Sequence, residues 1–252
     1  MLDVRFINEL RLAEMKRLVR FIPQGSRILE FGAGTGQQAR FLADRGFDVV
    51  AIDLAASNYA EHLVFPVQQY DGEHIPLESR SIDIVFSSNV LEHVENVPQV
   101  MTEFRRILRR SGLAIHVVPT TAWRFWTFVA GAGSSVLAAA RIPRDLISPG
   151  GGASRWPALS ANLRAVASGL IPSAHGTSPE GISELWTFSR RSWIRTFRKH
   201  GFEVVEDHPV GLFYTGHMLL ANKLPFEIRD RLSHVLGSGT RAYVLRRRPT
   251  SD

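Results

Sequence analysis

The chain has 252 residues, of which 44% are hydrophobic and 21% charged, with no cysteine and a formal net charge of +6. This length predicts one large domain with a sizeable core, and the composition excludes a disordered chain. The lack of cysteine excludes a disulfide framework, a thiolate metal site and a cysteine nucleophile, and it fits a reducing, cytoplasmic setting. The basic excess lies in short arginine clusters, which we interpret as solvated surface, with an anionic partner as the alternative.

The N-terminal segment predicts an amphipathic helix. Its apolar residues recur at three- to five-residue steps, and Pro23 with Gly25 ends the pattern. Charges are spread through the whole segment, so we expect no signal peptide there.

From Arg27 onward, short β-like runs alternate with helix-like stretches. This alternation predicts an α/β fold with a doubly wound, seven-stranded, mostly parallel sheet. The predicted strands are 27–31, 48–53, 64–68, 82–87, 113–118, 202–207 and 241–245, and the predicted helices are 37–45, 97–110 and one that begins at Phe188 and Ser189 and ends at Gly201. We expect a single domain, 1–252, made of a cofactor-binding half (1–119), an acceptor-binding insertion or lid after the fifth strand (120–186) and the last helices and strands (187–252).

The run ILEFGAGTG, residues 28–36, ends the first predicted strand and leads into a helix. Nucleotides bind at this point in doubly wound sheets, and glycine lets the backbone approach a ligand without a Cβ in the way. Asp53 ends the second strand 21 residues after Gly32, where a carboxylate can accept hydrogen bonds from both ribose hydroxyls. The spacing disfavours a nicotinamide oxidoreductase, because Gln37 stands where the last glycine of the dinucleotide fingerprint would be. The run also lacks the G-K-[ST] ending of a phosphate-binding P-loop.

The E-x-G-x-G-x-G pattern of this run resembles the first motif of class I S-adenosylmethionine-dependent methyltransferases. The resemblance extends from about residue 27 to residue 119 and includes the stretch YDGEHIPLESRSIDIVFSSNVLEHV. It implies S-adenosyl-L-methionine as cofactor and methyl transfer by in-line displacement. The cofactor-binding residues that it implies are Glu30, Gly32, Ala33, Gly34, Gly36, Asp53, Leu54, Asp71, Gly72 and Asn89.

The resemblance also implies how some of these residues act. Asp71 would accept a hydrogen bond from the adenine amino group, and the amide of Gly72 would face a ring nitrogen. Asn89 would lie near the methionyl part, and Glu30 would act at its amino group, directly or through a water. The alternative for each acid is a helix cap, a turn or a solvated edge.

Methyl transfer from a sulfonium requires mainly alignment, which can supply about 7–11 kcal/mol of barrier reduction. A hydroxyl acceptor would gain a further 10²–10⁴-fold, roughly, from a general base. Our candidate bases are His93, which follows the fourth strand, and His175, in the polar insertion. The alternative for His93 is an architectural role, His116 within a strand is expected in the core, and we expect no metal site.

The insertion should decide acceptor specificity. Residues 125–140 are a run of sixteen without a charge. This run is shorter than the roughly 20 residues needed to span a bilayer, so we reject a transmembrane helix. Two interpretations remain: a buried or lid helix over the acceptor, or a peripheral contact of 123–141 with the inner membrane face. Trp123 and Trp126 beside arginines suit an interface or a sugar-stacking pocket. The Gly-, Ser- and Pro-rich remainder predicts a mobile cover.

The acceptor is indicated only by the run VPTTAWRFWT, which is similar to stretches of bacterial methyltransferases of surface-glycan and lipid-linked sugar pathways. We therefore expect a hydroxyl of a glycan or lipid-linked intermediate. A nucleic-acid methyltransferase is the main alternative, but nucleic acid is an unlikely partner because SSNVLEH differs from the Asn-Pro-Pro-Tyr type that grips a flipped base. A non-catalytic regulator that binds S-adenosylmethionine is the other alternative.

Overall fold

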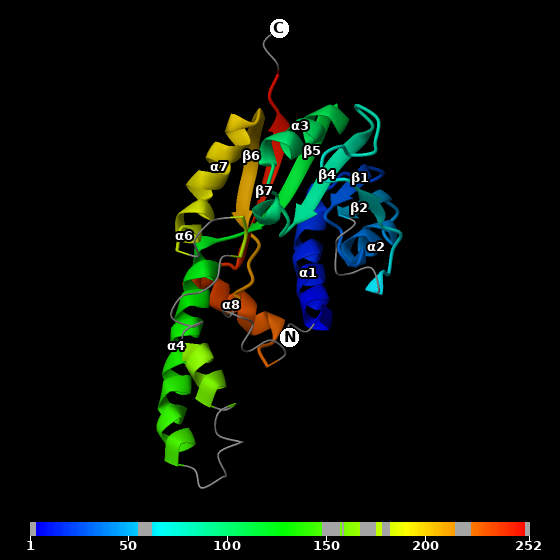
Figure 1. Cartoon of the computed structure of the whole chain (residues 1–252). Coiled ribbons are helices and arrows are strands. Elements are labelled where there is room, and N and C mark those ends of the chain that lie inside the picture. The colour runs from blue at the N-terminus through cyan, green and yellow to red at the C-terminus, as the bar shows by residue number, and fades with distance from the viewer. Residues whose placement is uncertain are drawn as a thin grey trace.

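The structure, a computed structural model, describes residues 4–54, 62–147, 157, 159–166, 175–177, 182–214 and 223–249. Within them the strands form one sheet of order β3-β2-β1-β4-β5-β7-β6 (Figure 1). β7 is antiparallel to both of its neighbours, and the other pairings are parallel. The strands are β1 (Arg27–Phe31), β2 (Asp48–Leu54), β3 (Gln68–Tyr70), β4 (Ile82–Ser88), β5 (Leu108–Pro119), β6 (Phe202–Pro209) and β7 (Thr240–Arg247). The predicted fold class is confirmed.

Helices cover both faces of the sheet. Side chains alternate along each strand, so Leu29 packs in the core cluster with Phe104 and Phe197, whereas Ile28 packs with Met15 and Leu42 on the opposite face. The α-helices are α1 (Val4–Leu18), α2 (Gln37–Ala43), α3 (Val97–Ile107), α4 (Thr121–Ile147), α6 (Glu184–Thr187), α7 (Arg190–Lys199) and α8 (Phe226–Leu236), and the short 3-10 helices are η1 (Val19–Phe21) and η3 (Leu91–His93). The alternation therefore places α1 and α2 on one face and α3 and α7 on the other.

The third predicted strand, 64–68, is wrong in position, because β3 begins only at Gln68. The backbone N–H of Val64 donates to the carbonyl of Thr35 at 2.9 Å. Phe65 and Val67 pack against small residues of the glycine run and α2. The apolar run thus covers the start of α2 instead of pairing with β2.

The predicted helix 97–110 is three residues too long, because α3 ends at Ile107 and β5 begins at Leu108. The amides of Arg80 and Ser81 donate to the carbonyls of Arg106 and Ile107. These bonds take over carbonyls at the end of the helix, and the chain turns there into the sheet.

Helix α4 corrects the argument that rejected a membrane-crossing helix. The uncharged run of sixteen residues was counted between two arginines, but the helix continues through both and is 27 residues long. Among the described residues, 121–143 form a helical stretch that is long and apolar enough to cross a membrane by length and composition. The core helix of a soluble protein can have the same length and composition.

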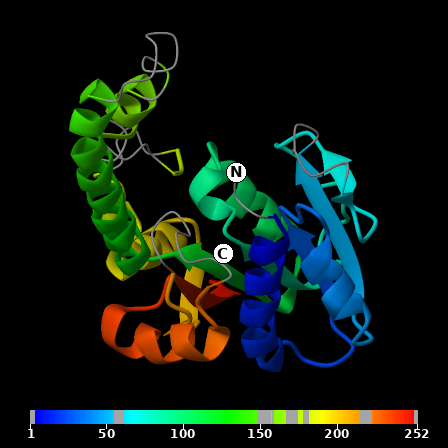
Figure 2. The same cartoon turned by 90° about the horizontal axis from the view of Figure 1, so that it is seen from below.

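The position of α4 is plain in both overall views. It leaves the carboxyl end of β5 and extends away from the sheet (Figures 1 and 2). Its far half is accompanied by the helical residues 159–166, and the Ser135 hydroxyl donates to the carbonyl of Val166 at 2.9 Å. Most of the predicted mobile cover that follows α4 lies outside the described residues.

Candidate active site

The glycine run forms a tight turn over the carboxyl end of β2. The amides of Gly32 and Ala33 donate to the carbonyl of Ile52 at 2.9 and 3.0 Å. Gly32 has φ +73°, and a Cβ there would lie 2.5 Å from Cγ2 of Val90. Only glycine fits both the backbone conformation and the space at this position.

Asp53 holds the turn in shape. Its Oδ2 accepts from the amide of Gly34 at 2.6 Å, and its Oδ1 accepts from the amide of Leu54 at 2.7 Å. The carboxylate therefore orders the glycine turn from the end of β2. Its contact with a ribose remains a prediction.

A cavity of about 160 Å³ opens beside the turn. Four of the predicted cofactor-binding residues line it, namely Gly32, Ala33, Gly34 and Asn89. The remaining lining residues are Ile7, Asn8, Arg11, Thr35, Gln37, Gln38, Ser88 and Val90. The sequence did not predict that α1 lines this cavity. Its polar residues Asn8 and Arg11 were the available signal. Asn89 has φ +54°, a strained conformation that is found often at functional sites.

The carboxyl of Glu30, just before the glycine turn, is buried and incompletely satisfied. Its side chain is 2% exposed, and Oε2 has no hydrogen-bond partner. Burial raises the pKa of Glu30 to about 8, with a smaller contribution from the charge of Asp53, against a backbone hydrogen bond from Ala39. A buried oxygen without a partner needs an explanation, and an ammonium group would supply its hydrogen bond.

The predicted adenine end is assembled separately from this cavity. A Cβ on Gly72 would lie 3.2 Å from Cδ2 of Leu54, so the end of β2 contacts the residues that follow β3. Asp71 forms a turn, because Oδ1 accepts from the amides of Glu73 and His74, and these bonds, that from His74 first, lower its pKa. This is the alternative role considered for Asp71, and its contact with adenine stays a prediction.

Gly36 lies outside the lining of the cavity. It has φ +74°, and a Cβ there would lie 2.8 Å from Cβ of Phe65. This position requires glycine for packing against the segment before β3, and a cofactor contact of Gly36 stays a prediction.

The two candidate bases are brought together from distant parts of the sequence. The ring centroids of His93 and His175 are 4.8 Å apart, and the Trp123 ring lies 4.6 Å from that of His175. Burial lowers the pKa of His93, opposed by the charge of Glu184. Burial also lowers the pKa of His175, to about 4, with further contributions from His93, Arg124 and Arg11. Partial burial therefore favours the neutral form of both rings.

Comparison with known proteins identifies the family. The family described as "Methyltransferase domain" matches residues 5–207. The chain belongs to this methyltransferase family. A malonyl-[acyl-carrier protein] O-methyltransferase of Pectobacterium atrosepticum is 30% identical over 111 residues, covering 42% of this chain and 44% of that protein. A sarcosine/dimethylglycine N-methyltransferase of Aphanothece halophytica is 32% identical over 101 residues, covering 36% of each. The chain thus spans less than half the length of these curated relatives.

Solved structures share the fold over nearly the whole methyltransferase. An S-adenosylmethionine-dependent methyltransferase of Mesorhizobium loti has a TM-score of 0.55 at 15% identity, covering 93% of this chain and 98% of that one. A methyltransferase in complex with the Trm112 activator of Haloferax volcanii has a TM-score of 0.56 at 13% identity, covering 98% and 95%. Family and fold together make the chain a class I methyltransferase with S-adenosylmethionine as its cofactor.

The residues of the methyltransferase fit this cofactor. Backbone at Gly32 and Gly34 lines the cavity, and Glu30, just before the turn, has a buried carboxyl oxygen without a hydrogen-bond partner among the described residues. The sulfonium of the bound cofactor would supply an activated methyl group. The protein would contribute binding, orientation and exclusion of water.

The structure confirms that His116 is a core residue. It is fully buried, Nδ1 lies 2.8 Å from the Ser87 hydroxyl, and the ring stacks between Phe104 and Phe197. Burial lowers its pKa to about 3. His116 is therefore neutral and takes no part in the site.

Glu92 is an acid of the methyltransferase that sequence reasoning missed. Its side chain is 4% exposed, and neither carboxyl oxygen has a hydrogen-bond partner in another described residue. Burial raises the pKa of Glu92 to about 8, opposed by an interaction with its own backbone amide and by the charge of Arg11, and reinforced by the charges of Glu14 and Glu184. The available signal in the sequence was that Glu92 follows the apolar residues Val90 and Leu91 and directly precedes the candidate base His93.

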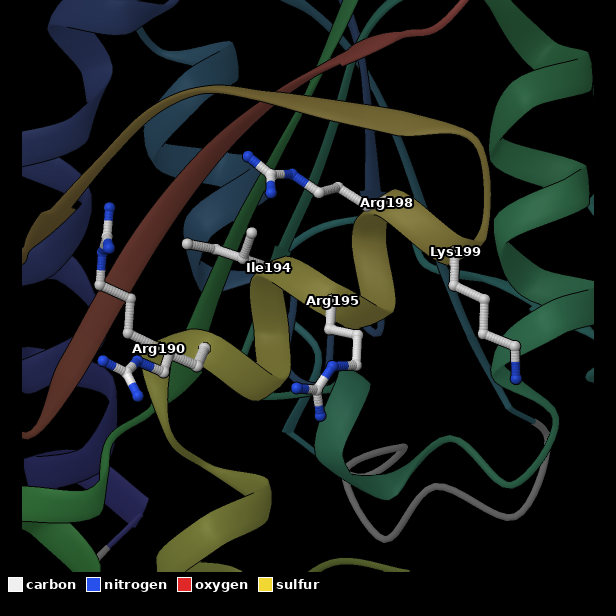
Figure 3. A pocket seen from close by; sticks show the side chains of 6 residues that line it. Arg190, Ile194, Arg195, Arg198 and Lys199 are labelled. Atoms are coloured by element: carbon white, nitrogen blue, oxygen red, sulfur yellow. The ribbon is translucent and has the colours of Figure 1, made fainter.

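A larger hollow, of about 660 Å³, lies on the outer face of α7 (Figure 3). It is lined by Arg190, Arg191, Ile194, Arg195, Arg198 and Lys199. Helix α7 packs on β6, at the opposite end of the sheet from β3. This basic surface is therefore separate from the glycine turn. Part of its charge is engaged, because Arg190 forms two hydrogen bonds with Asp207.

Proposed function

We propose that this methyltransferase transfers the methyl group of S-adenosylmethionine to a hydroxyl of a glycan or lipid-linked intermediate that is bound by the insertion 120–186. The observation that carries the proposal is α4. This helix begins two residues after β5, at the sheet end where doubly wound folds bind ligands, and it leaves an uncharged face exposed. Trp123 at its start contacts His175, so the acceptor side adjoins the candidate bases.

In the proposed reaction the acceptor hydroxyl would attack the methyl carbon in line with the sulfur, so that the O–C bond forms as the S–C bond breaks and S-adenosylhomocysteine leaves. The glycine turn and Asp53 hold the cofactor, and Arg11 and Asn8 close the cavity from α1. His93 accepts the hydroxyl proton, since burial keeps its imidazole neutral at pH 7. The lower pKa of His175 makes that ring the weaker base.

We further propose that α4 contacts a membrane from the cytoplasmic side. Phe125, Val129 and Val136 are exposed and fall on one face of the helix, since residues four and eleven apart point the same way. Val136 is 70% exposed and Leu137 lies beside it. Burial of this face in a lipid interface would remove it from water, and a lipid-linked acceptor would be presented at the same surface.

The test is to incubate the purified protein with methyl-labelled S-adenosylmethionine and separate lipid, glycan and nucleic-acid fractions of a cell extract. Label in the lipid or glycan fraction is expected. Label in nucleic acid would replace the proposal with the main alternative, which the basic hollow on α7 favours and which salt-dependent RNA or DNA binding would support. Cofactor binding without label in any fraction would indicate a regulator.

A further inference from the structure

We propose that Glu92, His93 and His175 form a binding site for a first-row divalent transition-metal ion. Each residue offers one ligand atom, and these atoms all lie within 4.8 Å of one another. Ligands at about 2.1 Å from a tetrahedral ion are about 3.4 Å apart, so small side-chain rotations would complete the site. No metal site was expected from the sequence, in which Glu92 and His175 stand 83 positions apart.

The donor set selects the kind of ion. Two imidazole nitrogens and one carboxylate oxygen suit Zn²⁺, Co²⁺ or Fe²⁺, whereas Mg²⁺ and Ca²⁺ take oxygen ligands. Three protein ligands also leave coordination positions open, as in catalytic rather than structural sites. Both histidine side chains are partly desolvated but still accessible to solvent, whereas Glu92 is buried, so the open positions would face outward.

Glu92 supplies independent evidence for a cation. A carboxyl that is 4% exposed and has no hydrogen-bond partner for either oxygen is costly unless something satisfies it. The histidines beside it have nitrogen lone pairs available when neutral. A metal ion would use all three groups at once, and it would account for the unsatisfied carboxyl.

The backbone holds the three residues together. The amide of Thr177 donates to the Glu92 carbonyl at 3.0 Å, and the amides of His175 and Gly176 donate to Glu184 Oε1 at 2.6 and 2.9 Å. Gly176 passes so close that a Cβ would lie 2.2 Å from the Glu92 carbonyl oxygen. The segment 175–177 is thus fixed against η3, and His175 is placed without any ion being required.

The surrounding charge also favours a cation. The charges of Glu14, Glu184 and Arg11 act on the Glu92 carboxyl, and the charges of Arg124 and Arg11 act on His175. Arg11 is bound by Glu14 at 2.8 Å, and Arg124 by Glu184 at 2.9 Å. Arg11 and Arg124 each form an ion pair with one of the other two acids, and no ion pair of Glu92 is seen among the described residues.

The site adjoins the cofactor cavity, because Val90 lines that cavity and stands two residues before Glu92. If the proposed function holds, an ion here would bind the acceptor oxygen and lower the pKa of its hydroxyl. His93 would then act as a ligand rather than as the base. Metal binding itself does not depend on the identity of the acceptor.

The test uses the full chain without an affinity tag, since tag histidines bind the same ions. Co²⁺ is titrated and followed by its visible absorption, and Zn²⁺ binding is measured by calorimetry. We expect one equivalent to bind, with Mg²⁺ failing to compete. His175→Ala and Glu92→Gln should each weaken binding roughly tenfold or more. His234→Ala is the matched control, because His234 also lies near an acid, Asp230, but on exposed α8, and it should bind as the unmodified chain does.

S-adenosylmethionine affinity of each variant shows that the fold is retained. Absence of a one-equivalent site, or equal affinity in the His175→Ala and His234→Ala variants, would overturn the metal proposal. Those outcomes leave the proposed methyl transfer intact, which label incorporation tests separately. Loss of label with a chelator and its recovery with added Zn²⁺ or Co²⁺ would place the ion in the reaction.

Discussion

At the residue scale, the missing Cβ of Gly32 and the carboxyl oxygens of three acids shape the region around the glycine turn. Gly32 and Gly25 share nearly the same left-handed backbone, with φ of +73° and +75°, yet only Gly32 has a neighbour in the space of its missing side chain. Asp53 accepts hydrogen bonds from two backbone amides. Glu30 and Glu92 are buried acids with unsatisfied oxygens. Gly32 and Asp53 therefore shape the backbone, whereas Glu30 and Glu92 have buried oxygens that a ligand could satisfy.

Replacing Gly32 with Ala should reduce both stability and cofactor affinity. The change imposes a left-handed backbone cost of about 1–2 kcal/mol and a clash with Val90 of roughly 1–3 kcal/mol. Gly25→Ala is the matched control, because it has the same backbone and nothing within 4 Å. Urea unfolding and calorimetry with S-adenosylhomocysteine measure the two effects. Equal losses in the two variants would contradict the role given to Val90.

Replacing Asp53 with Ala should loosen the glycine turn, because the amides of Gly34 and Leu54 lose their acceptor. We expect cofactor binding to weaken by about 1–3 kcal/mol. Asp44→Ala removes only an exposed pair with Arg40 and serves as the control. Calorimetric titration decides, and an unchanged affinity in Asp53→Ala would remove this residue from the site.

The buried carboxyl of Glu30 should make stability depend on pH. Its pKa rises from an ordinary 4.5 to about 8 on folding, so unfolding releases a proton between these values and the free energy of unfolding falls as pH rises. Glu30→Gln should remove part of this slope, on the order of a few kcal/mol over the window. Urea unfolding of the cofactor-free protein at several pH values between 5 and 8 measures it. Parallel curves for both proteins would show that Glu30 does not carry the effect.

At the scale of elements, α4 and the segment 175–177 are anchored by one acid. Glu184, at the start of α6, lies 2.9 Å from Arg124 of α4 and also accepts the amides of His175 and Gly176. Both charged side chains of the ion pair are buried. The position of α4 and of the segment 175–177 relative to η3 therefore depends on a few polar contacts in the interior.

Replacing Glu184 with Ala should cost about 3–5 kcal/mol, because Arg124 keeps a buried charge without its acid. The double variant Arg124→Ala with Glu184→Ala should lose less than the sum of the single variants. Arg40 and Asp44, an exposed pair four residues apart, should contribute less than about 0.5 kcal/mol. Urea unfolding tests all of these, and additive losses would show that the buried pair is not coupled.

At the scale of the whole molecule, three different surfaces surround one sheet. The cavity beside the glycine turn lies at the carboxyl end of the central strands, and the basic hollow lies on α7. Helix α4 extends away from the sheet (Figure 1). This separation allows cofactor binding, a charged surface and an apolar surface to be tested independently.

The membrane proposal predicts that the protein floats with lipid vesicles. Val136→Asp on α4 should weaken flotation, because it places a charge on the face proposed to enter the lipid interface. Val235→Asp on α8 is the matched control, since Val235 is 83% exposed on another helix. Cofactor affinity should be unchanged in both variants. Equal flotation of the two would contradict a membrane contact through α4.

The sequence by itself determined the order of strands and helices and the glycine turn. Period-two and helical patterns follow from local geometry, and Gly32 and Asp53 stand at positions fixed by the strands that they end. For the same reason the sequence misplaced the third strand, because Phe65 and Val67 are apolar whether they pair with β2 or cover α2.

Tertiary structure alone decided which distant residues meet. Arg11 reaches the cofactor cavity from α1, and His175 comes to His93 and Glu92 from inside a long insertion. Arg124 marks one end of a charge-free run in the sequence, yet in the fold its charge is matched by Glu184 and α4 continues through it. Such pairings depend on packing and on the cost of burying an unmatched charge, and neither is encoded in local spacing.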